Sequence, residues 1–323
     1  MSWIMTRRYA WPILFALVIF AGLNAAASPA FTDSGNWNGM LIGAAPFIIT
    51  AMAQTAVVMS GDGGVDLSVG PLAGLVNALI ASVLVPHGWT DPVSIVGATL
   101  LVGVASGILN GIMVAVVRVQ PIIATLGTYL AYQGITLEML PMAGGQAPDW
   151  LVAIANSRGG VPGVLVLLVA LGGAWLAFER TAFRRNLLAV GGDARAAYAS
   201  GVSVAAVRII AYVIGGILAA IGGLVFTAAL GSGDPRVGVP YTLTSIAAVA
   251  LGGVALSGGR GGMLGSAAAG ALLFLIQTLF TLAQVSIFYI QIMYGVILFL
   301  ALTLNAAGER ARRGRMALEA EAE

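Results

Sequence analysis

The polar side chains inside the long apolar stretches of this sequence are mainly amides and hydroxyls. They are Gln54, Asn77, Asn110, Thr125, Gln133, Gln277 and Gln291, together with Glu138 near the end of its stretch. Amides and hydroxyls donate and accept hydrogen bonds without a net charge, so this pattern favours weak binding of an uncharged, hydroxyl-rich solute along a path. Proton- or sodium-coupled transport usually relies on embedded Asp, Glu or His, and the middles of these stretches contain none.

Catalytic groups and metal ligands are scarce in the whole sequence. Cysteine and lysine are absent, and His87 is the single histidine. Without cysteine there is no disulfide, no thiolate nucleophile and no thiolate metal site. Without lysine there is no Walker A loop and no Schiff-base mechanism. We therefore expect no catalytic site, no metal and no cofactor, and any ATP that powers the protein must be hydrolysed by another chain.

A glycine-rich junction at residues 61–71 separates two apolar runs and contains two carboxylates. Its sequence is GDGGVDLSVGP, in which Pro71 suits the first turn of a new helix, and Asp62 and Asp66 suit the positive end of that helix. A broken helix at membrane depth is tolerated only where it is buried in protein or faces a watery cavity. Two interpretations stay open: a functional segment, and an N-terminal cap at an ordinary cytoplasmic turn.

The amide of Asn110 also has two open interpretations, an interhelical hydrogen bond and a place on a solute path. From the junction and the intramembrane polar residues together we predict a translocation path. Its candidate residues are Gln54, Gly64, Asp66, Ser68, Asn110, Thr125 and Gln277. The small residues Gly103, Gly107 and Gly111 share one face of a helix, and this spacing predicts close packing against another helix.

The composition indicates that the candidate path residues lie on helices in a membrane. The chain has 323 residues, of which 59% are apolar and 9% charged, whereas a soluble domain carries about 25% charged residues. This excludes a soluble enzyme and makes membrane lipid a partner of most of the surface. The arginines lie between apolar runs, a pattern that does not indicate a nucleic-acid partner.

Apolar runs bounded by charges, Pro and Gly predict about ten membrane-spanning helices. The runs cover residues 11–27, 40–59, 70–86, 93–117, 122–140, 161–178, 207–230, 243–256, 263–281 and 287–305. The first run also has features of a signal peptide, but we expect a retained helix because it makes the number of spans even. The run at 243–256 is too short to cross straight and predicts a tilted, kinked or partly re-entrant element.

Arginine placement gives the orientation. With the N-terminus inside, every arginine except Arg158 and Arg236 falls on the inner side, as the retention of positive charge in cytoplasmic loops requires. We therefore predict an all-α polytopic membrane protein with both termini cytoplasmic, forming a single transmembrane domain over residues 1–323 with a short cytoplasmic tail at 306–323. Because the outer loops are short, high-affinity capture of solute must come from a separate protein.

The longest inner loop, at about 179–206, predicts a docking element. Asp193 fits an N-cap, the alanines after it a short helix, and Gly201 its stop. Such a helix with a protruding Tyr198 has little to pack on in its own chain, which favours docking to a soluble partner; the alternative is a simple interfacial helix. The candidate docking residues are Gly192, Asp193, Arg195, Ala197, Tyr198 and Gly201.

Five segments in order resemble the permease subunits of ribose-type ABC importers, the membrane components of bacterial monosaccharide uptake systems. They are GGVDLSVG at 63–70, Asn110-Gly111, PIIATLGT at 121–128, GGDARAAYASGV at 191–202 and GGVALSGGRGGMLG at 252–265. The resemblance covers nearly the whole chain. The sequence departs from the family pattern at Asp62, which adds a charge, at Asp193, where Asn is common, and at Pro71 and Gly262, which replace Ser.

The resemblance implies two permease chains around a central path, two ATPase subunits below them and a periplasmic sugar-binding protein above, in the bacterial inner membrane. It implies that the loop at 191–202 is the coupling helix and that transport proceeds by alternating access. The alternatives are a branched-chain amino acid or nucleoside permease of the same fold, a stand-alone channel or ion-coupled carrier, and an intramembrane enzyme.

Overall fold

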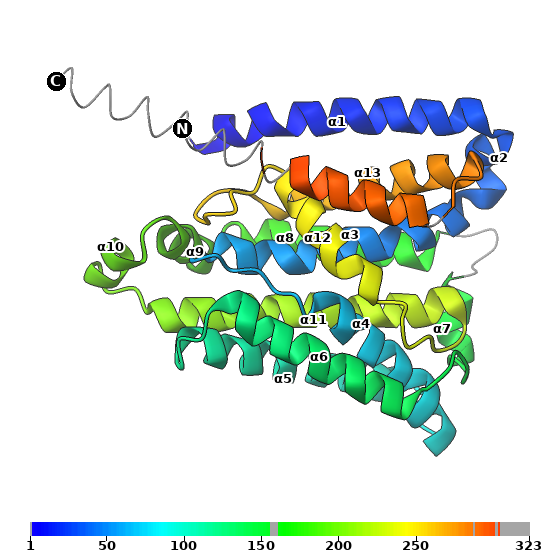
Figure 1. Ribbon diagram of the computed structural model, residues 1–323, viewed down its shortest axis with the longest axis horizontal. Coiled ribbons are helices and arrows are strands. Elements are labelled where there is room, and N and C mark those ends of the chain that lie inside the picture. Colours follow the sequence, from blue (N-terminus) through cyan, green and yellow to red (C-terminus); the bar gives the residue numbers. More distant parts are fainter. Residues whose placement is uncertain (1, 156–160, 287, 301–302, 304–323) are drawn as a thin grey trace.

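The computed structural model describes residues 2–155, 161–286, 288–300 and 303, with the backbone alone for residues 2–11 and 34. Long helices run side by side in one bundle (Figure 1). They are α1 (Ser2–Ala27), α3 (Trp37–Met59), α5 (Pro92–Ala115), α6 (Pro121–Met139), α8 (Gly163–Phe178), α11 (Val204–Leu230), α12 (Val239–Leu251), α13 (Met263–Leu282) and the apolar helix Phe288–Leu300. Within these described residues there is no strand, and Gly144 and Gly233 form an isolated antiparallel bridge.

Short helical pieces connect the long helices. They are α2 (Pro29–Thr32), η1 (Ser34–Asn36), α4 (Val69–Ala78), the π-helix η2 (Leu79–Leu84), η3 (Val85–His87), α7 (Asp149–Ala155), α9 (Ala182–Gly192) and α10 (Ala194–Ala199). The pieces α4, η2 and η3 follow one another without a break and together form a 19-residue apolar span. Helix α4 begins at Val69, so Pro71 lies in its first turn, as the sequence predicts.

The all-α class is confirmed for the described residues, which contain fewer helices of spanning length than the sequence predicts. Every predicted run contains helix in its described part. Among the described residues, five helices are long and apolar enough to cross a membrane, or six if the bent pair α8 and α9 counts as one span. Helix α12 has 13 residues, about 20 Å at 1.5 Å per residue, so it is too short to cross straight, as expected. A count of about ten crossings and cytoplasmic termini remain predictions.

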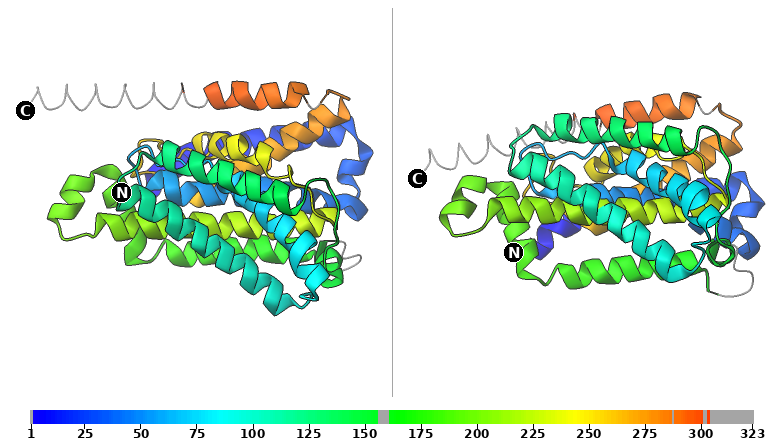
Figure 2. Two further views of the ribbon diagram at one scale, coloured as in Figure 1. Left: turned by 60° about the horizontal axis from the view of Figure 1, so that its bottom comes forward. Right: turned by 90° about the horizontal axis from the view of Figure 1, so that it is seen from below.

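The two ends of the bundle carry the loops that arginine placement assigned to opposite sides. At one end lie α9, α10 and the start of α1 (Figures 1 and 2). Arg118 and Arg208 line a cleft there together with Tyr198 of α10. At the other end the indole of Trp150 donates a hydrogen bond to the Thr90 carbonyl oxygen at 2.8 Å. We call these the inner and the outer end.

Glycines allow α5 and α11 to pack closely. A Cβ added to Gly103 would lie 2.7 Å from the Gly216 carbonyl oxygen, and one added to Gly111 would lie 2.8 Å from the Ile209 Cα. Real Cβ atoms do not approach other atoms so closely, so these positions require glycine. The predicted close packing on the Gly103, Gly107 and Gly111 face is confirmed, and α11 is the partner helix.

Three segments meet at the inner end through their glycine backbones, in what we call the glycine junction: Gly61, Gly191, Gly258 and Gly259. The Gly259 amide donates to the Met59 carbonyl oxygen at 3.1 Å. A Cβ on Gly61 would lie 2.8 Å from the Gly191 Cα, and Gly61 has the positive φ of 78° that favours glycine. The junction joins the end of α9 to the break after α3 and to the loop before α13.

Replacing Gly191 with alanine is expected to open the glycine junction, because the new methyl group would overlap the Met59 carbonyl oxygen. Overpacking of this kind costs about 1–3 kcal/mol. The matched control is Gly192→Ala, since a Cβ there meets nothing within 4 Å. Thermal unfolding in detergent, followed by circular dichroism, should show a lower midpoint for Gly191→Ala alone; equal loss in both variants would contradict the assignment.

Candidate functional site

The break between α3 and α4 is buried and held by Asp66. One carboxylate oxygen of Asp66 accepts hydrogen bonds from the Ser68 amide at 2.8 Å and from the Ser68 hydroxyl at 2.6 Å. With the Gln54 amide oriented to satisfy its partners, it donates to the Asp66 carbonyl oxygen at 3.0 Å and accepts from the Asp66 amide at 2.9 Å. Asp66 is 3% exposed. Its side chain and its backbone are therefore both fixed by protein groups.

A chain of hydrogen bonds ties this break to α5 and α6. The Asn110 amide donates to the Ser68 hydroxyl at 2.9 Å, and the Thr128 hydroxyl donates to the Asn110 oxygen at 2.9 Å. The Thr125 hydroxyl approaches the Val65 carbonyl oxygen at 3.2 Å. We call Gln54, Asp66, Ser68, Asn110, Thr125 and Thr128 the break network. All its side chains are buried, and Asn110 makes the interhelical hydrogen bond that one interpretation expected.

The predicted path residues divide into two groups. Gln54, Asp66, Ser68, Asn110 and Thr125 come together in the break network. Gly64 directly precedes Val65, whose carbonyl oxygen is bonded by Thr125. Gln277 on α13 lies apart from them. Its side-chain oxygen accepts a 2.6 Å hydrogen bond from the Tyr294 hydroxyl of the helix Phe288–Leu300.

Sequence reasoning missed two members of the buried polar interior. Thr128 completes the break network, and the helical spacing of Thr125, Thr128 and Tyr132 on one face of α6 would have pointed to it. Asn77, noted only as an intramembrane amide, donates at 3.0 Å to the Thr227 hydroxyl and accepts at 2.8 Å from the Asp234 amide. It thereby fixes the outer end of α11 to the broken span.

The inner loop forms the predicted short helix. The Asp193 carboxylate caps α10 by accepting from the amides of Arg195 at 2.9 Å and Ala196 at 3.0 Å. Gly201 follows the helix with φ of 85°, which satisfies the predicted stop. Ala197 is buried, whereas Tyr198 is 74% exposed. The helix therefore has one face on the bundle and presents an aromatic side chain outward.

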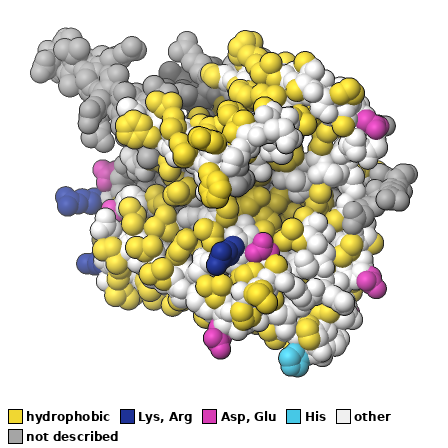
Figure 3. Space-filling model, turned by 45° about the vertical axis from the view of Figure 1, so that its right-hand side comes forward, with side chains coloured by type: hydrophobic (Ala, Val, Ile, Leu, Met, Phe, Trp, Pro, Cys, Tyr) yellow, Lys and Arg dark blue, Asp and Glu magenta, His cyan; other side chains and the backbone are white. Residues whose placement is uncertain are grey.

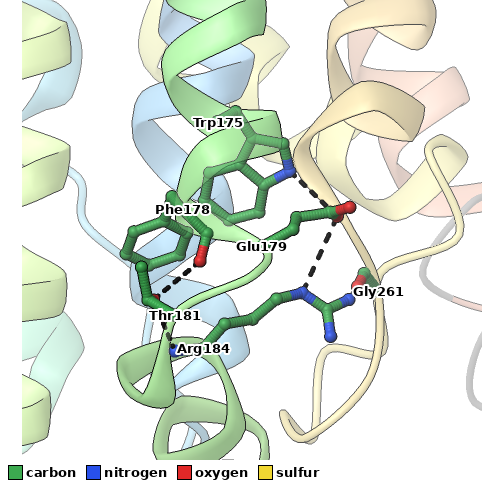
Figure 4. A network of polar contacts seen from close by, with 6 residues as sticks. All are labelled: Trp175, Phe178, Glu179, Thr181, Arg184 and Gly261. Atoms are coloured by element: carbon green, nitrogen blue, oxygen red, sulfur yellow. Dashed lines mark hydrogen bonds and ion pairs between the residues drawn. The ribbon is translucent and has the colours of Figure 1, made fainter.

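The direction of α9 is set where it leaves α8, at a bend of 77°. Glu179 occupies the corner (Figure 4): one of its carboxylate oxygens accepts from the Trp175 indole at 3.1 Å and lies 3.7 Å from the Arg184 Nε. The Thr181 hydroxyl oxygen accepts from the Arg184 amide at 3.4 Å and caps α9. The Arg184 guanidinium also reaches the Gly261 carbonyl oxygen at 3.5 Å. These contacts link α8, α9 and the loop before α13.

A cleft of about 670 Å³ opens at the inner end beside α10. It lies between α10, the start of α11 and the turn that joins α5 to α6, and Tyr198 lines it. Within it the Arg208 guanidinium pairs with the Asp62 carboxylate at 3.0 Å. Arg118, with a positive φ of 65°, adds a second cation. This end of the molecule is thus concave and charged, unlike the apolar sides of the bundle.

The chain is similar in sequence to known transport permeases. A family model described as branched-chain amino acid transport system / permease component matches residues 36–302. The ribose import permease protein RbsC of Escherichia coli (strain K12) is 31% identical over 312 residues, which cover 94% of both chains. No solved structure matches the chain.

Two further relatives come from the same species. The probable ABC transporter permease protein YphD of Escherichia coli (strain K12) is 33% identical over 91% of this chain and 87% of its own length. The autoinducer 2 import system permease protein LsrC of Escherichia coli (strain K12 / DH10B) is 32% identical over 80% of this chain and 75% of its own. With its apolar helical bundle and a family match over residues 36–302, the chain belongs to the family of branched-chain amino acid transport system permease components, and it is similar to the ribose import permeases.

Proposed function

We propose that the chain is the permease subunit of an ATP-driven importer in the bacterial inner membrane, and that it forms the path for a monosaccharide delivered by a periplasmic binding protein. The observation that carries this proposal is the 31% identity with a ribose import permease over 94% of both chains. A relative named as an autoinducer 2 import permease is similarly identical to this chain, at 32%. The proposed solute is therefore a small hydroxylated molecule, and ribose is one candidate.

The proposed assembly contains two permease copies, two ATPase subunits and the binding protein. Residues 1–323 act as one transmembrane domain, and α10 is the coupling helix that enters a groove of the ATPase. The capped helix, the exposed ring of Tyr198 and the adjoining charged cleft support this role, because together they offer a rigid, partly polar surface to a soluble partner. The docking residues are Gly192, Asp193, Arg195, Ala197, Tyr198 and Gly201.

Movement of the coupling helix would reach the interior through the glycine junction. Gly191 at the end of α9 contacts the break after α3, and that break continues into the break network. Because backbone meets backbone there, a push on α10 cannot be absorbed by flexible side chains. In the present conformation most of the predicted path residues are joined in the break network. The predicted path residues would line an open path once α4 and α6 separate, and Gln277 would contribute to it from α13. Apart from Gln277, these residues are Gln54, Gly64, Asp66, Ser68, Asn110 and Thr125.

Transport is expected to require the complete assembly. Proteoliposomes that contain the permease, its ATPase and its binding protein should take up labelled D-ribose when ATP is present on the ATPase side, whereas the permease alone should move none. The permease alone is the control that separates an ATP-driven importer from a channel or carrier. Uptake by the permease alone would contradict the proposal.

If α10 docks on the ATPase, losing its N-cap at Asp193 should have a larger effect on docking than losing the Asp193 charge alone. Asp193→Asn keeps an N-cap and should leave the helix intact, whereas Asp193→Ala loses the cap and costs about 1 kcal/mol. Combining Asp193→Ala with Arg195→Ala should leave the protein in the membrane but reduce uptake and co-purification of the ATPase subunit at least severalfold. Wild-type co-purification and uptake in the double variant would discard the docking assignment.

Orientation can be tested directly because the sequence has no cysteine. Met142, at the outer end, is 79% exposed and Tyr198 is 74% exposed. In intact cells, a membrane-impermeant maleimide should label Met142→Cys, and it should label Tyr198→Cys only after the inner membrane is opened. The reverse pattern would invert the topology and remove α10 from the ATPase side.

A further inference from the structure

The six intramembrane amides that the sequence analysis named fall into two classes. Asn77, Asn110 and Gln54 are buried with partners on both sides of the amide group, and Gln277 is bonded to Tyr294. Gln133 and Gln291 differ from these: no hydrogen bond joins their side chains to any residue in the described part of the chain. Gln133 is half-buried and Gln291 is exposed.

The two unpartnered amides face the same cleft. It has a volume of about 370 Å³ and lies between α6, the start of α12 and the helix Phe288–Leu300. Its lining residues are Tyr129, Gln133, Arg236, Val239, Pro240 and Gln291. Tyr129 and Gln133 are one helical turn apart on α6, so they lie on the same face. Arg236 belongs to the loop before α12, so the cleft opens toward the outer end.

Lipid is an unsuitable neighbour for this cleft. An amide that faces hydrocarbon without a partner is strongly unfavourable, whereas one that faces water or a polar solute is satisfied. The flanking side chains are apolar and highly exposed, as Leu130 at 61% and Ile292 at 61% illustrate. The space-filling view turned toward the outer end shows hydrophobic side chains interspersed with uncharged polar groups and backbone, and few charged side chains (Figure 3). The cleft is thus a polar strip in an apolar surface.

The chemistry of the strip fits a neutral polyhydroxylated solute. Each amide both donates and accepts, and the Tyr129 hydroxyl does the same, so the three groups match hydroxyls in either role. Asp234 lies next to Arg236 and accepts from its backbone amide at 2.8 Å. A carboxylate two residues from the arginine makes the mouth of the cleft mixed in charge rather than purely cationic. A volume of about 370 Å³ falls within the range of small-molecule sites.

We propose that Tyr129, Gln133 and Gln291 form a solute-contacting surface on the outer half of the path, with Arg236 at its mouth, and that the solute is an uncharged sugar. This inference rests on the proposed function for its solute class. The break network supports this surface in the present conformation: Thr125 and Thr128 bond to Val65 and Asn110 and hold α6 in place, and Tyr129 and Gln133 lie on the adjoining face of the same helix.

Thiol accessibility tests the cleft independently of transport. Gln133→Cys and Gln291→Cys, introduced singly into this cysteine-free chain, should react with a charged methanethiosulfonate reagent about tenfold or more faster than Leu130→Cys, the exposed apolar control outside the cleft on the same helix. Asn110→Cys, in the buried break network, should also react slowly. Equal rates for Gln133→Cys and Leu130→Cys would overturn the aqueous cleft and with it the proposal.

Uptake of labelled D-ribose by the reconstituted importer tests solute contact. Gln133→Ala and Gln291→Ala should each raise the half-saturating concentration of the loaded binding protein, or lower uptake, about five- to tenfold, while ATPase co-purification and thermal midpoint stay at wild-type values. Leu130→Ala should change none of these. Reactive cysteines combined with unchanged uptake in both alanine variants would overturn solute contact.

Failure of the wild-type importer to transport any sugar would have a different meaning. It would contradict the proposed function and the solute class, and the thiol reactivity would then decide only whether the cleft is open to water.

Discussion

The constraint on which this structure depends is that lipid offers no hydrogen bonds, so every interruption of a helix inside the bundle must be satisfied by the protein itself. The break between α3 and α4 meets this constraint through side chains. Gln54 pairs with both backbone groups of Asp66, and Asp66 in turn binds the amide and the hydroxyl of Ser68. Both the backbone and the carboxylate of Asp66 are therefore held by hydrogen bonds within the protein.

Close approach of backbones is the second consequence of the same environment. Since lipid supplies no hydrophobic force between helices, contact depends on fit, and glycines provide it along α5 and α11 and again at the glycine junction. The junction places the end of α9 directly against the break after α3. The exposed helix α10 and the buried break network are therefore connected through backbone atoms, a short and stiff route from the inner surface to the interior.

Local chemistry made several features predictable. The apolar runs predicted the helices because a membrane span needs about 20 apolar residues, and Asp193 and Gly201 predicted both ends of α10 because caps are set by neighbouring residues. The number of crossings was less predictable. Helix α12 is shorter than a membrane span. The segment Val69–His87 combines an α-helix, a π-helix and a 3-10 helix, and an apolar run in the sequence does not distinguish these helix types.

By itself the sequence determined the membrane environment, the helical class, the absence of thiol and lysine chemistry from this chain, and the family, since these follow from composition and from short motifs read in order. Only the tertiary structure decided which amides are satisfied. Gln54, Gln133 and Gln291 have the same side chain, yet Gln54 is held by the Asp66 backbone while the other two line an open cleft. The reason is physical: the partner of a polar group in a bundle comes from another segment of the chain, and its position depends on how the helices and the breaks between them pack.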